Sequence, residues 1–189
     1  MAESIYTVKD WATGTTYAKN NIVLVREDIG DTGIPKKIKY YYAIKSGQGQ
    51  TPPTYNNQYW AGYVASNGAA IPLFTWIPSY NATTSHKPRT LTINFGNGYE
   101  QRLPDGIFNG LITLSVSFDL RNEAEATAIL HFLRARKGAE SFVMQNLPQP
   151  YADIPGGGYR KRFICADFSS TFSFHNNYSI KATFIQKNN

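Results

Sequence analysis

The side chains best suited to chemistry in this sequence are three histidines and a single cysteine. His86, His131 and His175 are widely separated, and none lies at a metal-ligand spacing from another histidine or from Cys165. Cys165 alternates with its neighbours in a strand-like segment, which is typical of a small apolar side chain in a core. These residues therefore predict no metal site.

Two other patterns lack the partners that their chemistry would need. The run from Gly156 to Gly158 is not followed by the Lys-Ser/Thr pair of a phosphate-binding loop. Glu100 and Asp105 flank a predicted turn, and neither can be assigned to the carboxylate pair of a glycosidase. Because no nucleophile can be paired with a general base, the sequence predicts a protein that is not an enzyme and has no cofactor.

The composition is that of a folded, strand-rich protein. Hydrophobic residues make up 42% of the 189 positions and charged residues 17%, which excludes a disordered chain. The 13 tyrosines and 11 phenylalanines favour strands over helices. No apolar stretch reaches the roughly 18 residues that cross a bilayer, and the N-terminus lacks the pattern of a signal peptide. We therefore expect a soluble protein. The single cysteine cannot form an internal disulfide, which agrees with synthesis in a reducing cytosol.

The net charge of +6, from 19 Lys and Arg against 13 Asp and Glu, is spread along the chain. Proteins that bind nucleic acid usually concentrate such charge on one patch or helix. The densest basic clusters, Lys36 to Lys39 and Arg160 to Arg162, open predicted strands. They are either solvated strand ends or a surface for an acidic partner.

The chain divides into two parts of different composition. A run of small residues from Ser66 to Pro72 separates an aromatic-rich part from a longer part with strong periodicity. We therefore predict a small domain at residues 1–66, a linker at 67–72 and a larger domain at 73–189.

The larger domain predicts strands around one helix. Every second residue from Leu111 to Leu120 is polar, as in a half-buried antiparallel strand. Asn122 is a natural N-cap for a helix that carries acidic residues in its first turn and stops at Gly138. Further strands are predicted at 141–145, 159–168 and 178–185. The expected fold class is mainly β (α+β), with one packed helix.

The segment Phe95-Gly-Asn-Gly-Tyr-Glu-Gln-Arg102 follows an alternating stretch that begins at Thr90. Glycine and asparagine tolerate the positive φ that tight turns require. The segment therefore predicts a hairpin turn.

Together with this turn, the order of elements in the larger domain resembles the minor tail protein M family of long, non-contractile phage tails. The resemblance covers about residues 73–187. It rests on the FGNGYEQR turn, the alternating strand, the helix that ends near Gly138, the Ser141-Phe142 strand, a Pro-rich loop and the strands around Ile164 to Ser170. It implies a β-sandwich or barrel-like domain of the tail-tube type.

The resemblance also implies a structural protein of the virion, located at the tail tip after synthesis in the host cytoplasm. Such a subunit would form a hexameric ring that joins the tail tube to the hub and the fibre-bearing tip. DNA would pass through its lumen without specific nucleic-acid binding, and no membrane insertion is implied. The expected partners are further copies of the chain, the tail tube protein, hub or tip proteins and the tape measure protein.

Two groups of residues are candidates for these contacts. In the turn, Gly96 and Gly98 serve the geometry, while Tyr99, Gln101 and Arg102 are candidate subunit contacts because Tyr and Arg are favoured interface anchors. In the long loop after Leu147, a candidate assembly segment would become ordered only against a neighbour. It comprises Pro150, Ile154, Pro155 and Gly157.

Residues 10–63 have a second, shorter resemblance, to the chitin-binding type of carbohydrate module in families 5 and 12. It rests on Trp11 to Tyr17, Asn21 to Val25, Lys39 to Ala43, Gly49 to Pro53 and the closing Trp60. The sequence departs from that pattern in having asparagine where the usual glycine precedes the Val strand, and in an insertion at 26–37.

Sugar binding by such a module needs exposed aromatic faces. The candidate glycan contacts are Tyr40, Tyr55, Tyr59 and Trp60. Alternatively, most of the aromatic residues form the core of a small sheet that has few aliphatic side chains. The sequence thus leaves two functions open. One is a structural tail-tip protein with a small docking module, and the other is a carbohydrate-binding adhesion module on a virion platform.

Overall fold

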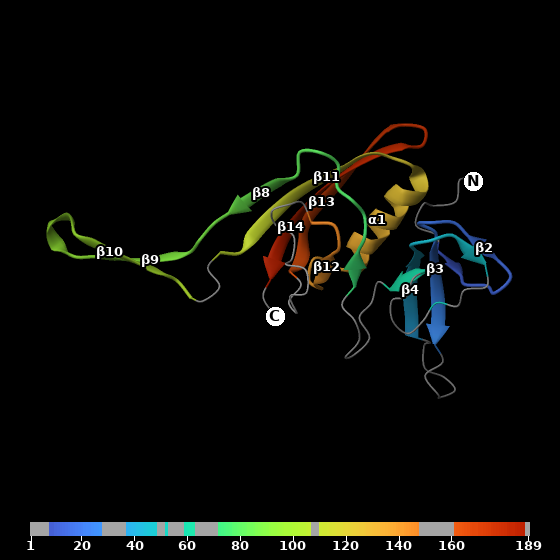
Figure 1. The fold of residues 1–189 in the computed structure, drawn as a ribbon, viewed down its shortest axis with the longest axis horizontal. Coiled ribbons are helices and arrows are strands. Elements are labelled where there is room, and N and C mark those ends of the chain that lie inside the picture. The colour runs from blue at the N-terminus through green and yellow to red at the C-terminus, as the bar shows by residue number, and fades with distance from the viewer. Residues whose placement is uncertain are drawn as a thin grey trace.

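The computed structural model describes residues 8–27, 37–48, 52, 59–62, 72–106, 110–147 and 161–187. Within these ranges it contains four sheets, one α-helix and one short 3₁₀ helix (Figure 1). The predicted mainly β fold is confirmed. The described strands do not form the barrel-like alternative, because each of their four sheets is open. The candidate assembly segment of Pro150, Ile154, Pro155 and Gly157 lies outside these ranges.

A six-stranded sheet forms the centre of the molecule, in the order β7-β12-β13-β14-β11-β8. Neighbouring strands are antiparallel except for β7 and β12. The strands are β7 (Leu73–Phe74), β8 (Thr83–His86), β11 (Ile112–Arg121), β12 (Phe142–Met144), β13 (Arg162–Phe174) and β14 (Asn177–Lys187).

The N-terminal part forms two smaller sheets. A four-stranded sheet has the order β1-β3-β4-β6, and β2 pairs with β5. The strands are β1 (Lys9–Asp10), β2 (Thr16–Tyr17), β3 (Ile22–Glu27), β4 (Lys37–Ala43), β5 (Gly47–Gln48) and β6 (Trp60–Gly62).

Helix α1 (Glu123–Ala135) covers one face of the six-stranded sheet. The Asn122 side chain accepts a hydrogen bond from the Glu125 N–H at 2.9 Å, which is the predicted N-cap. The helix ends before Lys137 and Gly138, which have positive φ angles of 51° and 69°. Its buried residues pack against the sheet, and each large side chain contributes roughly 1.5–3 kcal/mol by leaving water. They are Ala126, Ala128, Ile129, Leu130, Phe132 and Leu133.

The N-terminal sheet and the large sheet share one hydrophobic core. Tyr42 of β4 stacks on Trp76, with ring centroids 4.5 Å apart. The Tyr42 hydroxyl donates to the Leu73 carbonyl oxygen at 2.6 Å, and Trp76 Nε1 donates to the Asn20 side chain at 3.1 Å. Figure 1 shows the N-terminal strands beside α1, on the side away from the large sheet. The domain boundary at 67–72 stays a prediction, because residues 63–71 are not among those described.

Strand β4 is buried on both faces from Tyr41 to Ala43. Tyr41, next to Tyr42, belongs to a second core cluster with Tyr17 and Trp60. Successive side chains of a strand point to opposite faces, so the two tyrosines serve different cores. The small sheet therefore lies between two core clusters, one of which it shares with the large sheet.

Candidate functional site

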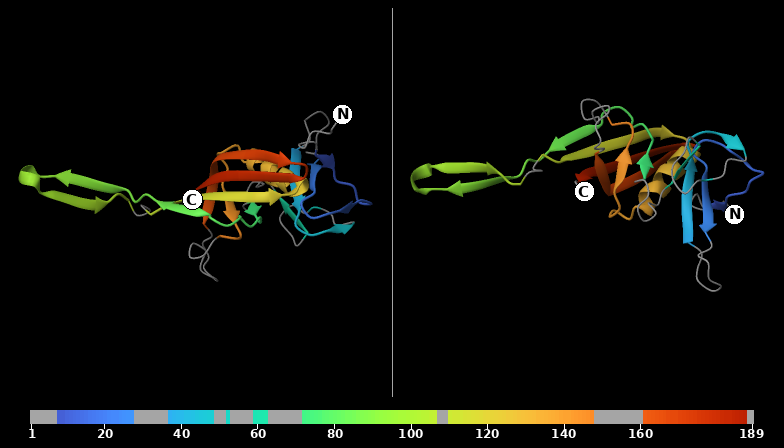
Figure 2. Two further views of the ribbon diagram at one scale, coloured as in Figure 1. Left: turned by 90° about the horizontal axis from the view of Figure 1, so that it is seen from above. Right: turned by 60° about the horizontal axis from the view of Figure 1, so that its bottom comes forward.

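A hairpin formed by β9 (Thr90–Asn94) and β10 (Glu100–Pro104) is exposed along the whole length of both strands. All of residues 90–104, here named the arm, are exposed to solvent. Figures 1 and 2 show the arm projecting far from the rest of the molecule. Between the described residues, its strands pair only with each other.

The turn of the arm is the one that the sequence predicts, with one difference in its backbone. The 3₁₀ helix η1 (Gly96–Gly98) joins the strands, and the Phe95 N–H donates to the Tyr99 carbonyl oxygen at 2.8 Å. Positive φ angles occur at Asn97 (66°) and Gly98 (79°). Gly96 does not have one, so the left-handed geometry rests on the second and third residues of Gly-Asn-Gly.

The register of the arm separates its side chains into an apolar face and a polar face. On the apolar face, Leu91 opposes Leu103 and Ile93 opposes Gln101. Alternation places Phe95 and Tyr99 on this same face at the tip. The apolar side chains of this face are 38–76% exposed: Leu91, Ile93, Phe95, Tyr99 and Leu103.

The opposite face of the arm is polar. Thr92 opposes Arg102, and Asn94 opposes Glu100. Arg102 forms an ion pair with Glu100 on the same strand. Of the three predicted contact residues, Tyr99 and Gln101 thus lie on the apolar face, whereas Arg102 lies on the polar one.

An amphipathic arm of this kind is suited to binding another surface. An isolated two-stranded hairpin is marginally stable in water, and exposed apolar groups gathered on one face of it favour association. The sequence predicts the turn but not the exposure of the arm, because the alternation of Thr90–Phe95 is also that of a strand packed on a core. The threonines and asparagine of the polar face indicate only that one side is solvated.

The candidate glycan contacts lie among packed aromatic residues. Trp60 is 2% exposed and meets Tyr17 edge to face, with ring centroids 5.3 Å apart. Tyr40 is partly buried against His131, at a centroid distance of 4.8 Å, and Tyr59 packs on the second core cluster. Tyr55 lies outside the described ranges. Stacking of a sugar on Trp60 would require this cluster to open.

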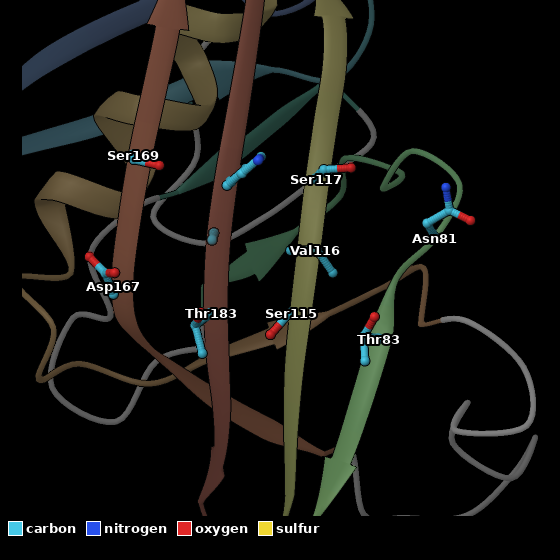
Figure 3. Close-up of a pocket in the computed structure, with 10 residues that line it drawn as sticks. Asn81, Thr83, Ser115, Val116, Ser117, Asp167, Ser169 and Thr183 are labelled. Atoms are coloured by element: carbon cyan, nitrogen blue, oxygen red, sulfur yellow. The ribbon is translucent and has the colours of Figure 1, made fainter.

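The face of the large sheet away from α1 is open and polar. It has a shallow depression of about 390 Å³, and half of the residues that line it carry a hydroxyl group, on β8, β11, β13 and β14. Figure 3 shows Ser115, Ser117, Asp167, Ser169 and Thr183 around it. Its lining includes Lys181 but neither histidine nor cysteine. The depression can therefore offer hydrogen bonds to a polar partner.

The residues that the sequence singles out for chemistry are dispersed in the structure. Burial raises the pKa of the Cys165 thiol to about 11, so this side chain is a poor nucleophile. Burial lowers the pKa of His131 to about 4, and the nearby charge of Arg134 acts in the same direction. Across the described ranges, no three His, Cys, Asp or Glu side chains are placed to hold a metal ion. In those same ranges no helix has the length and apolar character to span a membrane.

Comparison with known proteins defines the class to which this fold and arm belong. A family model of phage minor tail proteins matches residues 72–188, which include the arm, the large sheet and α1. The chain therefore belongs to the phage minor tail protein family, whose members are structural proteins of the phage tail. The first 71 residues lie outside the match.

A relative within this class is tail tip protein M of Escherichia phage lambda. It is 31% identical to this chain over 100 residues, which are 53% of this chain and 84% of the lambda protein. The resemblance to the minor tail protein M family is thereby confirmed. The resemblance to a carbohydrate-binding module is not supported by these matches.

Proposed function

We propose that this chain is a ring-forming subunit at the tip of a long, non-contractile phage tail, where it joins the tail tube to the hub and the fibre-bearing tip. Membership of the minor tail family and the similarity to a tail tip protein support this location. The tail tube, hub, tip and tape measure proteins are the expected neighbours in the virion.

The observation that carries the proposal is the arm with its exposed apolar face. In the described structure, the apolar side chains of this face do not pack on a core. Leu91 and Tyr99, for example, are 54% and 76% exposed. Such a face is costly in water unless another protein covers it. A subunit of a larger assembly has a neighbour that can do so, whereas a freely diffusing monomer does not.

The open sheet supports assembly in a second way. Strand β8 stands at one end of the strand order and β7 at the other. Edge strands left unpaired promote association, and a closed ring can pair or cover them in every subunit. The assembly would thus use both the arm and the sheet edges.

The mass of the purified full-length chain tests the proposal. We expect analytical ultracentrifugation to show a hexamer, with closed rings in electron micrographs of the same sample. A chain that stays monomeric at every soluble concentration would contradict the proposed ring. Retention of that monomer on chitin would support the alternative function, a carbohydrate-binding adhesion module.

A further inference from the structure

The two strands of the arm differ in what their outer edges offer to a partner. At the tip, the Phe95 N–H donates to the Tyr99 carbonyl oxygen at 2.8 Å. At the base, the Asp105 N–H donates to the Arg89 carbonyl oxygen at 3.0 Å. In an antiparallel pair, hydrogen-bonded residue pairs alternate with pairs whose N–H and C=O groups point away from the hairpin. These two bonds therefore fix which backbone groups of the arm face outward.

The edge of β9 presents a complete set of backbone groups. Its outward residues are Thr90, Thr92 and Asn94. Each presents one N–H and one C=O group, and none of the three side chains is charged. Among the described residues, no strand pairs with this edge. The edge can therefore bond an added strand along its whole length.

The outer edge of β10 is blunted. Its outward residues are Glu100, Arg102 and Pro104. Pro104 has no N–H to donate, and Glu100 and Arg102 form an ion pair with each other. Proline and charged side chains are means by which proteins keep an edge strand from pairing. Pro88, by contrast, precedes β9 and leaves the edge of that strand intact.

A strand added to β9 would also cover part of the apolar face. Neighbouring strands lie about 4.8 Å apart, so alternate side chains of the added strand would stand beside Leu91, Ile93 and Phe95. These three side chains are 54%, 38% and 53% exposed. The strand that fits is therefore extended, matches the five residues of β9 in length and is apolar at every second position.

We propose that the edge of β9 receives an extended strand of a different tail protein, which turns the arm into a three-stranded sheet. A two-stranded hairpin is marginally stable by itself, and a third strand over an apolar face supplies the pairing and burial that it lacks. Main-chain hydrogen bonds give such a contact its affinity, and the alternate side chains give it specificity. A neighbour in the tail supplies the strand, so the inference rests on the proposed function.

A second copy of the chain that presents its own β9 does not fit this edge. Two copies that pair through the same edge are related by a twofold axis. A ring with a tube on one side and a hub on the other has no such axis between its subunits. Self-pairing would therefore give a closed dimer in which neither copy has a β9 edge left for a neighbour.

Hydrogen exchange at single amides, measured by mass spectrometry, tests the added strand. The full-length chain is compared in dilute solution and in purified tails. We expect the amides of Thr90, Thr92 and Asn94 to exchange at least about tenfold more slowly in tails, because an added strand accepts their hydrogen bonds. The outward amides of Glu100 and Arg102 are the internal control and should change by less than about twofold.

Three results would overturn the added strand. Equal protection of both edges would show general burial of the arm. Unchanged exchange at β9, or protection of β10 alone, would leave the β9 edge without a partner strand. Protection of β9 that rises with the concentration of the chain in solution would identify a second copy as the occupant and overturn a different protein as the source.

Two proline variants give an independent readout. Thr92 and Arg102 oppose each other and both face outward, so proline at either site spares the hydrogen bonds within the arm. Pro104 already occupies such a position. Thr92→Pro removes an edge donor from β9, and Arg102→Pro, the matched control, removes one from β10.

Thr92→Pro should lower the amount of this chain in purified tails at least about tenfold, whereas Arg102→Pro should have little effect. Quantitative mass spectrometry of tails from phage that carry each variant gives the measurement. Circular dichroism of the purified chains should show the same fold for both. Equal incorporation of the two variants, whether high or low, would overturn a contact through the β9 edge.

The outcomes for the added strand and for the ring are separable. Protected β9 amides in tails that hold the chain without a closed ring would support the added strand and contradict the ring. Closed rings in tails whose β9 amides stay unprotected would support the ring and overturn the added strand. Tails without this chain would overturn both proposals.

Discussion

Arg136, which directly follows the last residue of α1, is fully buried. Its Nη1 atom lies 2.9 Å from a Glu140 carboxylate oxygen. Its guanidinium carbon lies 5.5 Å from the centroid of the Phe132 ring. The sequence pattern does not distinguish Arg136 from Arg134, because helix periodicity alone does not show which loop covers the helix end.

Arg136→Ala should lower the free energy of unfolding by about 2–4 kcal/mol, because it removes a buried side chain and leaves Glu140 without this partner. Arg134→Ala is the matched control, since Arg134 is exposed, and it should change the free energy by less than about 0.5 kcal/mol. Urea unfolding of both variants measures the difference. Equal effects would contradict a structural role that depends on the burial of Arg136.

The lowered pKa of His131 predicts that the folded protein loses stability in acid. Its pKa is lowered by burial from 6.5 to about 4 in the fold, so the unfolded chain binds its proton first as the pH falls. The stability contributed by this group is fully present above about pH 6.5 and is lost as the pH falls toward 4. The total loss is on the order of 1–3 kcal/mol.

Replacing the imidazole should remove this part of the pH dependence. Between pH values of about 7.5 and 4.5, wild type should lose more free energy of unfolding than His131→Gln, by on the order of 1–2 kcal/mol. Urea unfolding at the two pH values provides the measurement. The same pH dependence in both proteins would show that His131 is not the responsible group.

At the scale of elements, β4 joins the two parts of the chain. Tyr42 meets Phe132 of α1 at a centroid distance of 6.3 Å and hydrogen-bonds to the segment that begins at Leu73. The clue in the sequence is the unbroken aromatic run Tyr40 to Tyr42, because a strand with one solvated face would have a polar residue in the middle. Sequence alone could not identify which surface covers the second face.

Tyr42→Phe tests this connection with little change in shape. The variant loses the 2.6 Å hydrogen bond to the Leu73 carbonyl oxygen and should lower the free energy of unfolding by about 1–2 kcal/mol. Tyr80→Phe is the matched control, because Tyr80 is 95% exposed and should have almost no effect. An unchanged stability of Tyr42→Phe in thermal and urea unfolding would contradict the role assigned to this bond.

The elements that the sequence predicts best are those with complete local signals. The strand from Ile112, the N-cap at Asn122 and the turn at Asn97 each follow from alternation, capping or positive φ. The β13–β14 hairpin extends further than expected, to Arg162–Phe174 and Asn177–Lys187. Its outer part carries phenylalanines with no core beneath them, so burial patterns do not predict its length.

At the scale of the whole molecule, the exposed arm explains why sequence reasoning found the family but not the contacts. The apolar face of the arm is built from residues that a single-chain argument assigns to a core. Its exposure follows from topology, because the arm leaves the sheet after His86. Coverage by a neighbouring protein accounts for an apolar face that one copy leaves exposed.

The position and symmetry of this chain in the assembled tail test the central claim most directly. Electron cryomicroscopy of purified tails should show six copies in a closed ring between the tail tube and the fibre-bearing tip. The arm of each copy should lie against a neighbouring protein. A tail tip without density for this chain, or with the chain as a single peripheral appendage, would contradict the account.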